Sequence, residues 1–176
     1  MLDDRYQQWV DASSAAGAVE QFMVPLVKGL GRFDCHLIRE DARYATLNQE
    51  ESSSARESAL LAERFALSYF WVLAAYELVR TLDQRWRIGA TTLPDEFASR
   101  IAALKRRMER LRVPLLKMET PRRFPTDSTM AYPTNSTGFG IAWHVAEDMY
   151  ISRRELSDQL LGFLADLKKR QTATRA

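Results

Sequence analysis

A long apolar stretch in the middle of the sequence, residues 65–79, most constrains how this chain can fold. Thirteen of its fifteen residues are apolar or aromatic, Ser68 and Glu77 are the two exceptions, and no glycine or proline interrupts it. The helical pattern extends on both sides, over about residues 54–86. Because a helix that is apolar all round must be covered all round, we expect a core helix on which the other elements pack.

A membrane span is the alternative for this stretch, and a span needs about 20 apolar residues. Charged residues at 63–64 and at 77–80 bracket a shorter run, so the sequence favours a core helix and no membrane association. With 176 residues, 46% of them apolar, and four tryptophans, the chain can build one sizeable core. We expect a single domain over residues 1–170 and a disordered tail over residues 171–176.

The remaining pattern predicts a mainly α fold, a bundle of about four helices around 54–86. Gly29 and Gly31 are expected to end the second helix, and Pro25 either kinks that helix or marks its true start. Ser152 and Glu155 form a capping box at the start of the last helix. The flanking helices are expected over about residues 3–11, over 14–30, from Thr92 to a bend or end at Pro114 near Arg112, and over 153–169.

Two segments favour short β-hairpins. Residues 33–47 have apolar stretches on both sides of an acidic turn, although the turn lacks the usual Asn-Gly or Asp-Gly pair. Residues 139–151 alternate apolar and other side chains, and a helix over 141–150 is the alternative there. Residues 120–140, with three prolines and two glycines, read as a long irregular loop, which in a compact domain is often functional.

The net charge of +2 is unevenly distributed along the chain. Residues 1–60 carry a net charge of −4, whereas residues 100–123 carry nine basic and two acidic residues, a net charge of +7. In the predicted helix here, apolar residues recur from Ile101 to Met118 at spacings of three and four, so the cations lie on the opposite face. The candidate binding residues on and just beyond this face are Lys105, Arg106, Arg107, Arg110, Arg112, Lys117, Arg122 and Arg123.

This basic face predicts an anionic partner, either nucleic acid or an acidic protein surface, because phosphates need cations but no particular sequence. Two other readings remain open: a solvated helix face, and a face paired with the acidic first third of a neighbouring copy. Few aromatic residues lie among the cations, which argues against stacking on single strands.

The polar residues of the central helix form an alternative candidate site, made of Tyr69, Tyr76, Glu77 and Arg80. The two tyrosines lie seven residues apart on one face, and Glu77 and Arg80 are spaced to pair. If the pair is buried, the site fits a small-molecule sensor or an enzyme. An ion pair at the surface and a subunit contact are the other interpretations, since aromatic and arginine side chains are enriched in interface cores.

Known catalytic motifs are absent from the sequence: it has no Gly-x-Gly-x-x-Gly, P-loop or Gly-x-Ser-x-Gly. Cys35-His36 and the lone His144-x-x-Glu147 would supply metal ligands only if their segments met. We therefore expect no catalytic residue, metal or cofactor. The single cysteine fits a reducing compartment, and the sequence as a whole predicts a non-enzymatic cytoplasmic interaction or assembly module, as a homodimer.

Overall fold

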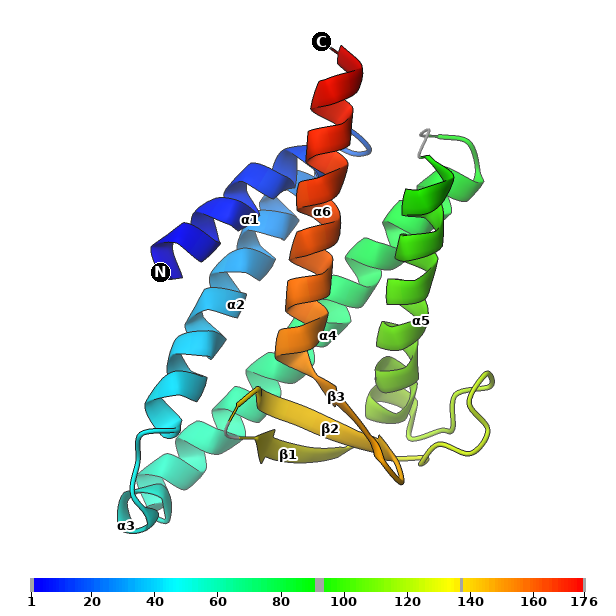
Figure 1. The fold of residues 1–176 in the computed structure, drawn as a ribbon. Coiled ribbons are helices and arrows are strands. Elements are labelled where there is room, and N and C mark those ends of the chain that lie inside the picture. Colours follow the sequence, from blue (N-terminus) through cyan, green and yellow to red (C-terminus); the bar gives the residue numbers. More distant parts are fainter. Residues whose placement is uncertain (1, 91–93, 137, 176) are drawn as a thin grey trace.

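The computed structural model describes residues 2–90, 94–136 and 138–175, which form six helices and one three-stranded antiparallel sheet (Figure 1). The mainly α fold with a short hairpin agrees with the sequence prediction. In chain order the elements are α1 (Leu2–Gly17), α2 (Met23–Tyr44), α3 (Gln49–Ser52), α4 (Ala55–Arg87), α5 (Asp95–Lys117), β1 (Tyr132–Ser136), β2 (Gly140–Ala146), β3 (Met149–Ser152) and α6 (Arg153–Arg175).

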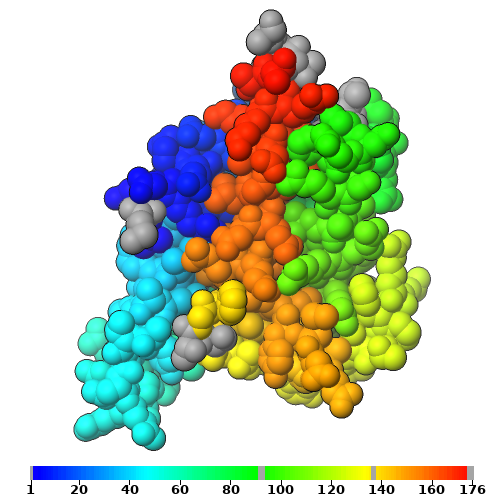
Figure 2. Space-filling view, viewed as in Figure 1, coloured from blue at the N-terminus to red at the C-terminus, as the bar shows by residue number. Residues whose placement is uncertain are grey.

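The last helix, α6, lies between the two halves of the molecule. In Figure 1, α1 and α2 stand on one side of it, α5 stands on the other, and α4 crosses behind. The space-filling view shows α6 in orange and red filling the space between the blue and green helices (Figure 2). Apolar side chains from all these elements form one core, in which Trp9, Trp71, Ile141 and Leu156 are fully buried.

The central helix α4 begins and ends within one residue of the predicted span of 54–86. Ser54 caps its start, since the Ser54 hydroxyl accepts a hydrogen bond from the Glu57 amide at 3.2 Å. Trp71 and Val79 lie on its buried side. Local sequence therefore determines the extent of this helix.

The prediction that α4 is covered on every side is wrong. By length and composition α4 is apolar enough to cross a membrane, with a mean hydropathy of 1.2 over its most apolar 18 residues, but only 28% of that window is buried. Figure 1 shows why so little of α4 is buried: α2, α5, α6 and the sheet lie in front of α4 and along its flanks. One apolar face of the longest helix is left open.

The segment predicted as one helix over 14–30 is divided between two helices. α1 continues to Gly17, and α2 begins at Met23, so Pro25 lies in its first turn, where proline is tolerated. Gly29 and Gly31 do not end α2. A Cβ at Gly31 would overlap the Trp9 ring, so this glycine serves the close packing of α1 on α2.

α2 continues to Tyr44, so the hairpin predicted over residues 33–47 is wrong. Val27, Leu30 and Leu37 continue a helical stripe through the glycines and are buried against α1 and α4. Tertiary packing on this stripe outweighs the helix-weakening effect of the two glycines.

The hairpin predicted over residues 139–151 is confirmed, because β2 and β3 pair as an antiparallel hairpin. β1, within the segment expected to be a loop, pairs with the other edge of β2, with Tyr132 opposite His144. Because of Pro133 and its polar residues, β1 lacks the apolar alternation that predicts a strand. Proline is nevertheless compatible with an edge strand.

The boundaries of the last two long helices follow their capping residues. α5 continues past Pro114 to Lys117 and ends at Met118, which has a left-handed φ of 54°. The cap predicted at Thr92 lies outside the described residues. The capping box of α6 is present: the Ser152 hydroxyl accepts from the amides of Arg154 and Glu155 at 3.0 and 3.3 Å, and Glu155 accepts from the Ser152 amide at 3.5 Å. α6 then continues to Arg175, through most of the segment expected to be a disordered tail.

Candidate functional site

The basic face of α5 is partly neutralised within the chain. Four of the eight candidate cations have ion-pair partners: Lys105 with Asp83 at 2.7 Å, Arg107 with Glu155 at 2.8 Å, Arg110 with Asp127 through two bonds of 2.5 and 2.6 Å, and Arg112 with Glu77 at 3.9 Å. These partners lie 17 to 48 residues away for the first three pairs. The four others have no ion pair within the described part of the chain: Arg106, Lys117, Arg122 and Arg123.

The polar residues of α4 do not converge on one site. Glu77 and Arg80 pair at 2.7 Å with side chains 47% and 45% exposed, so they form a surface ion pair. Tyr76 is buried beneath Arg112, whose guanidinium lies 4.7 Å from the ring centroid. Tyr69 is half-buried and packs edge-on against Phe70. None of the main pockets formed by the described residues is lined by these four side chains.

The cysteine and the histidines show no metal-binding arrangement. The buried Cys35 thiol contacts the Leu2 carbonyl oxygen at 3.6 Å, and His144 packs against Tyr150. No group of three or more His, Cys, Asp or Glu side chains able to hold a metal ion occurs in the ranges that the structure describes.

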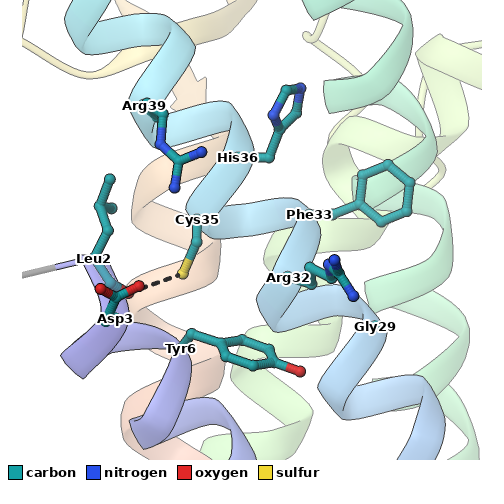
Figure 3. Close-up of a pocket in the computed structure, with 9 residues that line it drawn as sticks. All are labelled: Leu2, Asp3, Tyr6, Gly29, Arg32, Phe33, Cys35, His36 and Arg39. Carbon is teal, nitrogen blue, oxygen red and sulfur yellow. Dashed lines mark hydrogen bonds between the residues drawn. The ribbon is translucent and has the colours of Figure 1, made fainter.

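A surface groove of about 790 Å³ runs along α2 beside the start of α1 (Figure 3). Tyr6 points across the groove from α1, whereas Phe33 and His36 point away from α1. Arg32 and Arg39 add positive charge to the α2 side, but both are exposed. The groove is open and holds no buried polar group without a partner among the described residues, so it carries little specificity.

A second cluster was not predicted from the sequence and is the most unusual chemical feature of the fold. We call it the buried arginine network: Arg5, Asp34, Asp41, Arg64 and Arg153, from α1, α2, α4 and α6. Asp34 accepts from Arg5 and from Arg153 at 2.6 Å each, and Asp41 accepts from Arg64 at 2.9 Å and from Arg153 at 3.3 Å. The network joins four helices, and its directly hydrogen-bonded side chains are up to 119 residues apart in the sequence.

Burial makes this network energetically important. The side chains of Asp34 and Arg153 are 0% exposed and that of Arg64 is 3% exposed. Burial by itself raises the pKa of Asp34, but the charges of Arg153 and Arg5, with hydrogen bonds from Ser157 and Arg5, outweigh it and lower this pKa below its ordinary value. Asp34 is therefore held as a carboxylate.

The network has more hydrogen-bond donors than acceptors. Nε and Nη2 of Arg64 and Nε of Arg153 are buried and have no hydrogen-bond partner among the described residues, although the Arg64 guanidinium lies 4.3 Å from the centroid of the Tyr44 ring. Beside Arg153 lies a pocket of about 220 Å³ between α2, the start of α6 and residues 138–140. Arg153, Arg154 and Asp41 are its charged lining residues. Buried donors without acceptors are rare in folded proteins, which makes this pocket the best candidate for a binding site.

Comparison of the chain with protein-family models, curated proteins and solved structures finds no match. The function must therefore be argued from geometry. A sequence search could have detected the network only through Arg64, a charge next to a long apolar run, and Arg153, a cation at the usually acidic start of a helix.

We expect Gly140→Ala to destabilise the protein by about 2–3 kcal/mol. Gly140 has a φ of +66°, and a Cβ there would overlap the Asp41 carboxylate, which holds two network arginines. Gly89→Ala is the matched control, since Gly89 has a φ of +70° and open space around it, and strain alone costs about 1–2 kcal/mol. Urea unfolding measures both variants. Equal losses would show that Gly140 is needed only for its backbone conformation.

Proposed function

We propose that this protein is a non-enzymatic interaction module that pairs with a second copy through α4 and presents a basic surface to an anionic partner. The observation that supports pairing is the open side of α4. We call this side the α4 outer face and define it by Ala59, Ala62, Ala66 and Phe70, all exposed, with Phe70 60% exposed. Contiguous apolar surface of this kind marks an interaction site.

Lipid is a poor occupant for this face. Glu63 and Glu77 are exposed and flank its apolar centre. Fourteen residues of helix span about 21 Å, which is less than the ~30 Å of a bilayer's hydrocarbon core. A protein surface about as long as four helical turns fits this spacing.

A second copy of the chain is a suitable occupant. In a two-fold pair, the same surface meets itself, so two α4 helices would cross in opposite directions. A crossing centred between Phe70 and Leu73 places Glu63 of one copy opposite Arg80 of the other. In the same crossing, Phe70 of each copy packs against Leu73 of the other, close to the two-fold axis. Both the charges and the apolar side chains at the crossing therefore suit self-association.

Sedimentation equilibrium tests the pairing. We expect a species of twice the 20.2 kDa chain mass at micromolar concentration, dissociating on dilution. A protein that remains a monomer at 100 μM, a deliberately high concentration chosen for the test, would refute the proposal.

The basic surface of this proposal consists of the four candidate cations without an ion pair in the described ranges: Arg106, Lys117, Arg122 and Arg123. Arg106 and Lys117 lie eleven residues apart, about three turns of α5, so they share one side of the helix. The proposed partner is the one that the sequence predicts, a nucleic acid or an acidic protein. The proposed location is the reducing cytoplasm, which agrees with the single, buried thiol of Cys35.

We expect duplex DNA or RNA to bind with an affinity that falls about 10²-fold between 50 and 200 mM salt, the value for about four phosphate contacts. Arg123→Glu should lower both the affinity and the salt dependence. Arg56→Glu, an equal change of charge at the exposed start of α4, is the control. The absence of a mobility shift at low salt would leave an acidic protein as the partner class and rule out nucleic acid.

A further inference from the structure

The pocket beside the buried arginine network lies at the start of α6. Figure 2 shows the 138–140 turn in yellow between the cyan α2 and the orange start of α6. α2 contributes Ile38, Asp41, Ala42 and Ala45, and α6 contributes Arg153 and Arg154. Its volume of about 220 Å³ corresponds to about seven water molecules at 30 Å³ each.

Two independent features of this pocket favour an anion. The first is the start of a 23-residue helix, where the aligned peptide dipoles give a positive potential. The second is Arg153, a wall residue that is 0% exposed and whose Nε donor has no acceptor among the described residues. Arg154, 34% exposed, adds a second guanidinium at the rim; its Nε donates to Asp158 at 3.2 Å, and no hydrogen bond among the described residues uses its two terminal nitrogens.

The charges of the network are balanced. Its three guanidinium groups meet the carboxylates of Asp34 and Asp41, and Asp158 pairs with Arg5 at 2.7 Å. The network instead lacks an acceptor for a buried donor, since Nε of Arg153 has no hydrogen-bond partner among the described residues. A buried donor without an acceptor is costly, and an oxyanion in contact with it removes that cost.

Asp41 also lines the pocket and would repel an anion if its charge were free. Its two oxygens instead accept hydrogen bonds from Arg64 and Arg153, which offset that charge. Asp41 therefore orients Arg153, which lines the pocket. The same carboxylate explains why the turn above it is Gly140, the position where a side chain would collide with it.

We propose that this pocket binds a small oxyanion, a phosphate or carboxylate group, held by Arg153 and Arg154 at the start of α6. Planar guanidinium groups bind such groups through parallel N–H bonds, which a chloride ion cannot accept in the same way. Since Ser152 already occupies the amides of Arg154 and Glu155, the ligand is held by side chains and by the helix dipole.

Isothermal titration calorimetry and thermal unfolding with sodium phosphate and with sodium acetate test the proposal, each against sodium chloride of equal ionic strength. At ten times the dissociation constant, the bound anion should raise the unfolding temperature by about 3–6 °C above the chloride control. The two arms distinguish a phosphate site from a carboxylate site. The absence of heat and of stabilisation with both anions at 50 mM, a chosen upper limit, would overturn the proposal.

Two variants locate the binding and leave the five side chains of the network itself unchanged. Arg154→Ala removes the rim guanidinium and should weaken anion binding about tenfold, the size of one charge-assisted hydrogen bond. Ala42→Trp fills the pocket from the exposed side of α2 and should abolish binding. The controls are Arg123→Ala and Thr46→Trp, the latter one turn beyond Ala42 and outside the pocket lining. Unchanged anion affinity in both test variants would refute this location of the site.

Discussion

Replacing Asp34 with asparagine should destabilise the protein by about 3–5 kcal/mol, the cost of breaking a buried ion pair by removing one partner. Asparagine is nearly the same size, but it leaves Arg5 and Arg153 without their common counterion, and Arg153 is fully buried. A domain of this size is stable by only about 5–15 kcal/mol, so the change removes a large fraction of the total. Urea unfolding gives the loss as a shift of the midpoint at constant slope.

Asp158→Asn is the matched control for this substitution. Asp158 also pairs with Arg5, at 2.7 Å, but its side chain is 48% exposed. Exposed pairs contribute about 0–1 kcal/mol, so the control should change little. Similar losses in the two variants would mean that solvent reaches the network and that burial does not set its strength.

The same carboxylate predicts a dependence of stability on pH. The pKa of Asp34 is lower in the folded protein than its ordinary value of 3.8, so its charged form stabilises the fold at every pH above that value. This contribution is lost as the pH falls below about 4 toward the lower folded pKa. The difference in urea midpoint between the protein and Asp34→Asn should therefore be constant at neutral pH and shrink in acid. A difference that grows in acid would contradict this sign.

Replacing Phe70 with glutamate should convert the proposed dimer into a monomer. Phe70 is the largest side chain of the α4 outer face, and a central aromatic contact of an interface is worth about 2–4 kcal/mol, a 30- to 1,000-fold change in dissociation constant. Two copies of the new charge would also meet near the two-fold axis. Sedimentation velocity over a concentration series measures the change.

Ile88→Glu provides the control for Phe70→Glu. Ile88 is 66% exposed at the end of α4 and lies outside the outer face, so this substitution should leave the dimer intact. The monomeric variant should keep its helical circular dichroism and its unfolding cooperativity, because Phe70 contributes little to the core. A dimer that survives Phe70→Glu would place the interface elsewhere.

Local patterns in the sequence predict α4, α5 and α6 well. The spacing of Ile101, Leu104, Met108 and Leu111 gives the buried side of α5, and the Ser152–Glu155 capping box gives the start of α6. The same reasoning fails for α2, because glycine weakens an isolated helix but here allows Trp9 to pack against Gly31. Contact with a neighbouring helix, which no local window contains, decides the outcome.

The candidate site depends even more on distant contacts. Arg153 and Asp34 are 119 residues apart in the chain, and nothing near either residue indicates the other. The basic face of α5 shows the converse: the sequence shows eight cations, but only the fold reveals that four have carboxylate partners. The position of a charged residue in the sequence indicates on which face of a helix it lies. It does not indicate which residue of opposite charge will pair with it.

Because residues of the buried arginine network are far apart in the sequence, the network can form only late in translation. During translation, Asp34 and Asp41 leave the ribosome long before Arg153, and 119 residues take about 6–24 s at 5–20 residues per second. In that interval α1 and α2 can pair, but their carboxylates lack the arginine that joins them. The start of α6 therefore completes the network late in translation, and the nascent chain reaches its full stability only when its final helix has been made.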